Sequence, residues 1–395
     1  MKFVMILAAG VADEPIEALD GRTPLESAHT PALDELARNG KTGRIRTLYD
    51  DLPASEEVAL LSCLGYDPHK YFCGEAGLAV ADSGLRVGRD QLAFMHNLTT
   101  ESNDVLIDHA AGQITPKEAE ALLTSLAAAL GRPEVSFWSG RGFTGVTVLP
   151  VPEGGEPECV PPERVLGLPI AKHLPVERET DIARKVIETS REVFKEHEVN
   201  RIRADLNENP ANLLWLWGPG RAPVLPPFES CYGLRAAMVA ASESARGLGR
   251  LCSMRVPHVP GATGGYRTDY AAKARHALEL IEEFDLVVVH VASPAEAALE
   301  GNIERKVSAI GDMDAMLVAP LFEHASRRGD MRLLFASSHV ASCVRRQRLR
   351  SETPVAIFGP GIQPLRGNAF SEANSVIGEL GVDEAHGFLA YFLTR

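Results

Sequence analysis

Three side chains of the sequence, Glu56, Glu296 and His339, are candidates for acid/base chemistry. Carboxylates and imidazoles transfer protons near neutral pH, and the same groups hold divalent metal ions. With Glu57 they could form an acid/base site or a single-metal site, if the fold brings their loops to one rim. The simpler interpretation is that His339 is a polar loop residue satisfied by backbone groups. By the same reasoning, His290 is a core histidine.

The element that must position these groups is the segment 284–301, FDLVVVHVASPAEAALEG. Its apolar run from Leu286 to Val291 is typical of a strand that is buried on both faces of a parallel sheet. We expect this strand to run into a loop and then a helix. Open α/β sheets bind their ligands beyond the carboxyl ends of such strands. Glu296 is the one strong acid/base group in that loop, so the expected active-site position carries little chemistry.

Apolar runs interrupted by Gly and Pro predict the remaining elements. Around the organising strand we expect strands at 2–8, 332–336 and 353–359, and helices at 23–40, 58–64, 268–283 and 302–321. From about residue 85 we expect strands at 90–99, 104–110, 143–149 and 213–217, and helices at 115–130, 181–197 and 232–248. Residues 256–266 have the Pro and Gly density of a hinge. The prediction is a sheet domain of residues 1–85 and 262–395, with a second α/β domain, residues 86–261, inserted into it.

The composition is that of an ordinary globular protein with two domains. The chain has 395 residues, 45% of them hydrophobic and 24% charged, which is long for a single core. A formal net charge of -13 argues against nucleic-acid binding. No segment has the pattern of a signal peptide or the ~18 apolar residues of a membrane-spanning helix, so no membrane partner is expected. The six cysteines are scattered without CxxC spacing, which favours a reduced, cytoplasmic protein.

Several strings of residues give the chain a resemblance to a known family. They are Ala12-Asp13-Glu14-Pro15, Leu64-Gly65-Tyr66-Asp67-Pro68, Asn209-Pro210-Ala211-Asn212, Trp215-Leu216-Trp217-Gly218, Pro260-Gly261-Ala262-Thr263-Gly264, Lys306 with Ala309-Ile310, and Phe358-Gly359-Pro360-Gly361. Over essentially its whole length the chain resembles the archaeal-type, cofactor-independent phosphoglycerate mutases of the alkaline phosphatase superfamily. The resemblance implies an α/β fold: an alkaline-phosphatase-like, mostly parallel sheet flanked by helices, with an inserted second α/β domain.

The resemblance also implies a chemistry that this chain does not match. The family uses two divalent metals about 4 Å apart, which activate a serine nucleophile for phosphoryl transfer. The family's nucleophile and metal-shell residues fall on Ala9, Glu56, Leu60, Ala295, Leu299, Ser338, His339 and Arg348, of which His339 alone keeps the family's residue. A shift of one residue would restore Ser55 as the nucleophile but would not restore the carboxylates. The family's substrate-binding arginine in the inserted domain falls on Thr144.

We therefore expect no metal site and no cofactor. Glu56, His339 and Glu296 are predicted to be catalytic only if the site has been given a new chemistry. Arg348, Ser338 and Ser55 are the predicted ligand-binding residues, because a permanent cation at position 348 could replace lost metal charge and hold an anion. The alternative for Arg348 is a solvent-facing side chain in a basic segment that also holds Arg345, Arg346 and Arg350.

Three hypotheses for the function stay open. The first, which the lost ligands favour, is a catalytically degenerate homologue that lacks the two-metal site and the serine nucleophile and acts as a binding or accessory protein. Its partners would be a phosphorylated or other anionic small molecule, an active paralogue or a pathway enzyme. The second is an enzyme with metal-free or single-metal chemistry in the same cleft. The third is a phosphoglycerate mutase that interconverts 3-phosphoglycerate and 2-phosphoglycerate, which rests on resemblance alone.

Overall fold

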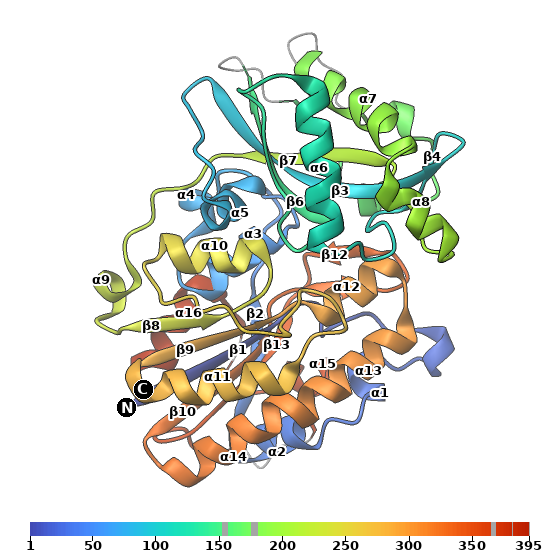
Figure 1. Ribbon diagram of the computed structural model, residues 1–395. Coiled ribbons are helices and arrows are strands. Elements are labelled where there is room, and N and C mark those ends of the chain that lie inside the picture. The colour runs from blue at the N-terminus through green and yellow to red at the C-terminus, as the bar shows by residue number, and fades with distance from the viewer. Residues whose placement is uncertain (152–156, 175–180, 365–368, 381, 395) are drawn as a thin grey trace. The chain divides into compact units, whose positions relative to one another are not determined.

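The computed structural model describes residues 1–151, 157–174, 181–364, 369–380 and 382–394. The chain divides into two compact units (Figure 1). The larger unit comprises Met1–Phe72 and Val224–Arg395, and the inserted unit comprises Cys73–Pro223. In the part of the chain that is described, no helix is long and apolar enough to cross a membrane.

The larger unit is built on a mixed, mostly parallel sheet. Its strands follow the order β14-β2-β13-β10-β1-β9-β8. Their bounds are β1 Lys2–Ala8, β2 Lys41–Arg46, β8 Ala236–Val239, β9 Leu286–Val291, β10 Met331–Ser337, β13 Thr353–Phe358 and β14 Val382–Glu384. Strands β10, β1, β9 and β8 run parallel to one another, whereas β13 is antiparallel to both β10 and β2. The central strands are apolar because helices cover both of their faces.

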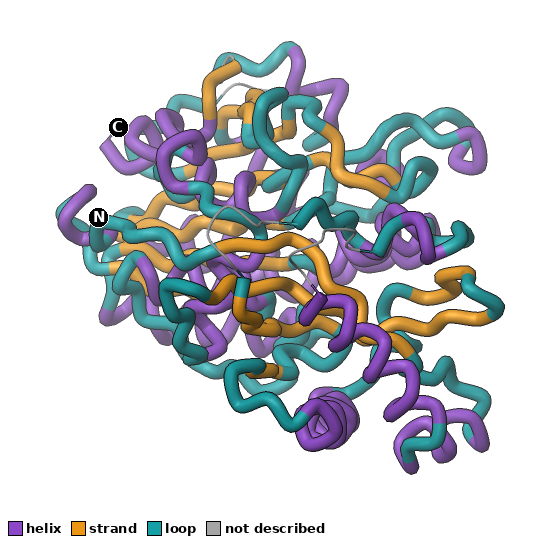
Figure 2. The backbone as a smooth tube through the Cα atoms, turned by 90° about the horizontal axis from the view of Figure 1, so that it is seen from above, coloured by secondary structure: helices purple, strands orange, loops and turns teal. Residues whose placement is uncertain are grey.

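Helices lie on both sides of this sheet, as Figure 2 shows for the strands near the N-terminus. One face forms the main core with helices α2 Pro31–Asn39, α11 Tyr270–Glu283, α13 Ile303–Met313 and α14 Ala319–Arg328. Helices α3 Glu56–Cys63, α10 Glu243–Leu251 and α16 Ala385–Thr394 pack together elsewhere on the sheet, α10 against β8 and α16 against β2. The α/β class and the helix-flanked, mostly parallel sheet expected from the sequence are confirmed.

The inserted unit has its own antiparallel sheet and its own core. The sheet runs β4-β3-β6-β5, and β7 pairs with the free edge of β3. The bounds are β3 Gln91–Ser102, β4 Val105–Asp108, β5 Ser136–Trp138, β6 Thr144–Pro150 and β7 Leu213–Gly220, with helices α5 Ala76–Ser83, α6 Pro116–Leu130, α7 Asp181–Lys195 and α8 Glu198–Asp205. Thr115 and Glu118 form a capping box at the start of α6, and its buried leucines join the core of this unit.

The remaining described elements are short. They are α1 Pro24–Ser27, α4 Pro68–Tyr71, α9 Phe228–Tyr232, α12 Ser293–Glu300, α15 Glu372–Val376, the hairpin strands β11 Val340–Ser342 and β12 Gln347–Leu349, and 3-10 turns at Glu17–Leu19, Pro162–Val165 and Ile170–Lys172.

The helix predicted at 232–248 is wrong. Gly233, with φ +68°, ends helix α9, and the buried strand β8 follows before α10 begins. Small apolar residues satisfy either a helix or a short buried strand, so periodicity could not separate the two. Because β8 pairs with β9, the chain is already back in the larger sheet well before residue 262, where we expected its return.

The single helix predicted at 302–321 is in fact three segments. Helix α13 ends at Met313, a π-helical segment η4 runs over Asp314–Val318, and α14 continues from Ala319. Asp314 lies in the wider turn, where its carboxylate accepts backbone N–H groups of Ala32 and Leu33, 3.0 and 2.8 Å away. These are unpaired donors of the first turn of α2, so the π-helical segment caps that helix.

Candidate functional site

The carboxyl ends of β9, β1 and β10 meet at one edge of the larger sheet. Ala8 at the end of β1 is in register with Val291 of β9 on one side and with Ser337 of β10 on the other. Residues that follow these strands must therefore lie close together, at the place where open α/β sheets bind ligands.

Glu56 is the centre of a hydrogen-bonded group at this edge. It lies in the first turn of α3, and its Oε1 accepts a 2.6 Å hydrogen bond from Oγ of Ser242. The same oxygen lies 3.5 Å from Nε2 of His290, whose side chain is buried within β9. Ser242 is also the N-cap of α10, because its Oγ accepts the backbone N–H of Ala245. We refer to Glu56, Ser242, His290, Ser338, His339 and Arg348 as the polar cluster.

His339 is a fully buried member of the polar cluster. Its Nδ1 lies 3.2 Å from Oγ of Ser338, and both residues are fully buried. Its Nε2 has no hydrogen-bond partner among the described residues. Burial lowers the pKa of His339 well below its usual value, and the charges of Arg348, His290 and Lys306 lower it further. The imidazole is therefore neutral at physiological pH and has one nitrogen without a protein partner.

The other residues predicted for the site are placed as follows. Arg348 lies on β12, opposite Ala341 of the β11 strand that follows His339. Glu296 is buried in the first turn of α12, on a helix and not on the loop that we expected. Ser55 is the N-cap of α3 and accepts the backbone N–H of Val58, so its side chain serves its own helix.

Several positions to which the resemblance assigns metal ligands, among them Ala9 and Ala295, carry apolar side chains. Ala9 and Ala295 belong to one buried apolar cluster, together with Ala341 and Cys343. A Cβ placed on Gly10 would lie 2.6 Å from Cα of Ala295, so helix α12 packs directly against the end of β1. Alkyl side chains offer no ligand atoms to a hard cation. Among the described residues, no three His, Cys, Asp or Glu side chains are grouped to hold a metal. The residues present do not fit a pair of divalent ions.

A buried ion pair supports the loop that follows β1. Nζ of Lys306 lies 2.7 Å from Oδ2 of Asp13, and neither side chain is exposed. The same ammonium donates to the carbonyl of Ala341 at 2.7 Å, and Oδ2 of Asp13 accepts the backbone N–H of Cys343. This pair ties the loop after β1 to α13 and to the β11–β12 hairpin, so its role in the fold is structural.

Three buried polar residues near the site were not predicted from the sequence. His290 was assigned to the core, although its side chain faces Glu56, and Ser242 lay within the wrongly predicted helix. Lys273 of α11 is fully buried and donates to the carbonyl of His290 at 2.9 Å. Burial lowers the pKa of Lys273 to about 8. A polar residue inside an apolar run, as in Val289-His290-Val291, was the signal that could have identified His290.

In the inserted unit, an arginine lies beside the position at which the resemblance places one. Nε of Arg141 donates to Oγ1 of Thr144 at 2.9 Å. Its guanidinium also stacks over the ring of Phe143, 4.8 Å from the ring centroid. Thr144 thus occupies the position at which the resemblance places an arginine. The guanidinium of Arg141, three residues earlier in the chain, contacts its side chain.

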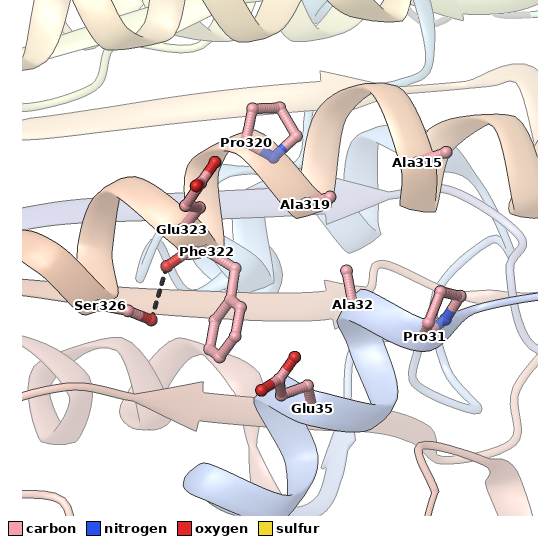
Figure 3. A pocket seen from close by; sticks show the side chains of 9 residues that line it. All are labelled: Pro31, Ala32, Glu35, Ala315, Ala319, Pro320, Phe322, Glu323 and Ser326. Carbon is pink, nitrogen blue, oxygen red and sulfur yellow. Dashed lines mark hydrogen bonds between the residues drawn. The ribbon is translucent and has the colours of Figure 1, made fainter.

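A separate groove of about 670 Å³ lies between α2 and the η4–α14 segment (Figure 3). Its walls include Ala32 and Glu35 of α2 and Pro320, Phe322 and Glu323 of α14. None of the residues predicted for the site lines it, so the groove is distinct from the polar cluster.

Comparison with known proteins identifies the family. The family model described as 2,3-bisphosphoglycerate-independent phosphoglycerate mutase matches residues 37–200. The chain is 37% identical, over 98% of its length and 98% of the relative's, to the enzyme of that name from Methanothrix thermoacetophila. It is also 37% identical to the enzyme of the same name from Methanosarcina barkeri, over 98% of this chain and 97% of that one.

Solved structures agree with this relationship. The cofactor-independent phosphoglycerate mutase from Thermoplasma acidophilum is 25% identical with a TM-score of 0.56, and the match covers 100% of this chain and 99% of that chain. A protein from Pyrococcus horikoshii is 25% identical with a TM-score of 0.76, and the match covers 99% of this chain and 96% of that one. The chain belongs to the archaeal-type 2,3-bisphosphoglycerate-independent phosphoglycerate mutase family.

Proposed function

We propose that this family member does not carry out two-metal phosphoryl transfer and instead binds a small anionic ligand at the polar cluster, as a binding or accessory protein. The observation that supports this most is the apolar packing of Ala9, Gly10 and Ala295, where a metal centre needs carboxylates. A divalent cation in that position would lose its hydration without gaining oxygen or nitrogen ligands, which is strongly unfavourable.

Arg348 is the group of the polar cluster that would attract an anionic ligand. Arg348 is permanently protonated and acts on His339, which itself is neutral. The carboxylate of Glu56 is engaged by Ser242 and His290. A guanidinium can hold a phosphate or a carboxylate through its N–H donors. The protein partner that recognises the ligand-bound form would then be an active paralogue or a pathway enzyme.

Binding in the absence of divalent metal tests this proposal. Isothermal titration calorimetry of the full chain with 3-phosphoglycerate in EDTA should detect saturable binding. Arg348→Gln should weaken that binding, and Arg38→Gln, an exposed arginine of α2, should leave it unchanged. No saturable binding, or binding that appears only when Mn²⁺ is added, would refute the proposal.

The second candidate is the mutase itself. It is supported by 37% identity over 98% of the chain to enzymes that carry this name. Similarity by itself favours this candidate over the first, whereas the residues at the sheet edge favour the first. The mutase predicts conversion of 3-phosphoglycerate to 2-phosphoglycerate in an enolase-coupled assay with added Mn²⁺. Turnover that EDTA abolishes would establish it, and no turnover above a no-protein control would eliminate it.

A further inference from the structure

The groove between α2 and the η4–α14 segment has an apolar floor. Six of its nine lining residues are alanine, proline or phenylalanine. Figure 3 shows the ring of Phe322 pointing toward α2. This ring is 9% exposed and packs edge-on against Phe358, with 4.9 Å between the ring centroids, so its position is fixed. Concave apolar surfaces of this kind are typical of binding sites.

The two walls of the groove are fixed relative to each other. The carboxylate of Asp314, in the π-helical segment, accepts the backbone N–H groups of Ala32 and Leu33 at 3.0 and 2.8 Å. Ala32 itself lines one wall, and Ala315, which directly follows Asp314, lines the other. A ligand therefore meets a groove that is already formed, and little binding free energy is lost in ordering it.

The groove is long and open, which favours a polypeptide segment over a small molecule as its ligand. On the η4–α14 side the lining residues run from Ala315 to Ser326, which is about 16 Å along a helical segment. Five of the nine lining residues are exposed to solvent, namely Pro31, Glu35, Ala315, Glu323 and Ser326. A small-molecule site encloses most of its ligand, whereas an amphipathic helix needs only its apolar face covered.

The charged groups that line the groove are both carboxylates. Its polar lining residues are Glu35, Glu323 and Ser326, and Oγ of Ser326 donates to the carbonyl of Phe322 in its own helix at 2.8 Å. Glu323 forms an ion pair with Arg327 one turn later on α14, but these side chains are 59% and 78% exposed. Such an exposed pair contributes little stability, so a ligand can replace the arginine at little cost. The rim therefore favours a ligand with positive charge.

We propose that this groove binds a basic amphipathic helix of another protein, about three turns long. The apolar face of that helix covers Phe322 and the alanines of the groove, and its lysines or arginines lie against Glu35 and Glu323. A second copy of this chain is a poorer occupant, because a formal net charge of -13 on each copy opposes self-association. The groove is distinct from the polar cluster, so this inference goes beyond the proposed function and does not depend on it.

Fluorescence anisotropy with the full chain and a labelled synthetic peptide tests the proposal. The probe is a helical peptide of about 18 residues with leucines at i, i+3, i+4 and i+7 spacing and lysines on both sides of the leucine face. We expect saturable binding of this peptide. The same peptide with glutamates in place of the lysines should bind at least about tenfold more weakly. No saturable binding of the lysine peptide, or equal binding of both peptides, would overturn the proposal.

Variants of exposed residues show whether the peptide binds in the groove. Glu35→Lys should weaken binding of the lysine peptide by about threefold to tenfold, and Glu279→Lys on α11 is its control, with the same change in net charge outside the groove. Ala315→Trp should weaken binding at least as much, because it adds a bulky side chain to the wall. Its control is Ala128→Trp on α6. Equal effects of the groove variants and their controls would contradict the proposal. If Ala315→Trp does not fold, the two lysine variants decide.

Sedimentation velocity of the protein without peptide tests the second copy as an alternative occupant. We expect the wild type and Ala315→Trp to have the same oligomeric state. A wild-type dimer that Ala315→Trp converts to a monomer, while Ala128→Trp does not, would assign the groove to a second copy of the chain and refute the proposal.

Discussion

Glu56 illustrates how neighbouring groups fix a partly buried carboxylate. It starts helix α3 and is engaged by groups from two distant elements, Ser242 and His290. A hydrogen bond to a charged group contributes about 1.5–3 kcal/mol, more than one between neutral groups. The carboxylate is thus held in place by its neighbours.

A double-mutant cycle tests this contact. Ser242→Ala and Glu56→Leu should each destabilise the protein, and the pair should show a coupling energy of about 1–3 kcal/mol in urea unfolding. The cycle is needed because Ser242 also caps α10, a contribution that the single variant alone cannot separate. Ser244 and Glu57, also joined at 2.6 Å, provide a matched pair that should couple similarly. Additivity of Ser242→Ala and Glu56→Leu would contradict the account.

Lys273 gives a pH dependence with a definite sign. Burial lowers its pKa from 10.5 to about 8 in the folded state, so the unfolded chain binds more protons between these values. The free energy of unfolding therefore rises with pH in this window. As the pH falls toward 8, this stabilisation is lost. Between pH 7 and 9.5 the gain should be about 2 kcal/mol.

The check is urea unfolding of wild type and Lys273→Met at both pH values. The stability of the wild type relative to the variant should rise by about 2 kcal/mol from pH 7 to 9.5. Groups common to both proteins, such as the buried thiols, cancel in this comparison. Lys70→Met, at an exposed position of α4, should show no such change. A difference that is constant with pH would show that Lys273 titrates normally.

For individual residues, the sequence indicates which side chains are candidates for the site better than it indicates which groups they contact. His339 and Arg348 were identified because of their type and their place in a resemblance. The contact between Ser242 and Glu56 joins residues 186 positions apart, which no local pattern encodes. Ser55 was predicted to bind ligand, and its cap role follows from the helix that starts just after it.

Among the elements, the junction of β1 with α12 matters most. Gly10 follows β1 with φ +66°, and its missing side chain lets α12 approach the strand closely. This close packing occupies the sheet edge where a pair of metal ions would need room. The close packing of α12 against β1 and the apolar side chains there both argue against a pair of metal ions at this edge of the sheet.

Gly10→Ala should destabilise the protein by about 2–5 kcal/mol, from left-handed backbone strain and from overpacking against Ala295. Gly329→Ala is the matched control, because Gly329 has φ +70° with no atom within 4 Å of its added Cβ. It should cost about 1–2 kcal/mol for backbone strain alone. The measurement is the free energy of unfolding in urea, and equal losses for the two variants would contradict the packing argument.

Elements with a strong pattern were predicted well. The apolar run of β9 and the capping box of α6 identify a buried strand and a helix start without tertiary information. Strand β8 was missed because its four residues, Ala236–Val239, are small and apolar, and only pairing with β9 decides their state. The π-helical turn at Asp314 could not be seen either, since it depends on contacts with α2.

For the whole molecule, the division into two units has an experimental consequence. All three tryptophans, Trp138, Trp215 and Trp217, belong to the inserted unit. Trp215 is buried in the core of that unit, so tryptophan emission reports its folding alone. The expected boundaries of this unit were 13 residues late at its start (73 against 86) and 38 late at its end (223 against 261). The late end follows from the unrecognised strand β8, which pairs with β9 of the larger sheet.

A fragment of residues 73–223 should fold by itself, since it has a contiguous chain, a closed core and its own sheet. Its tryptophan emission should shift to the red in one cooperative transition with urea, as for an independent domain. The full chain is the control, because its three tryptophans all lie in the same unit. If the tryptophan emission of the fragment is already red-shifted in buffer without urea, the unit needs the rest of the chain to fold.

The central claim is that the sheet edge has no place for a pair of divalent ions. Equilibrium dialysis of the full-length protein against Mn²⁺, followed by metal analysis of both compartments, tests it most directly. The account predicts equal Mn²⁺ concentrations on the two sides of the membrane. Retention of near-stoichiometric or higher Mn²⁺ with the protein, reversed by EDTA, would contradict the account.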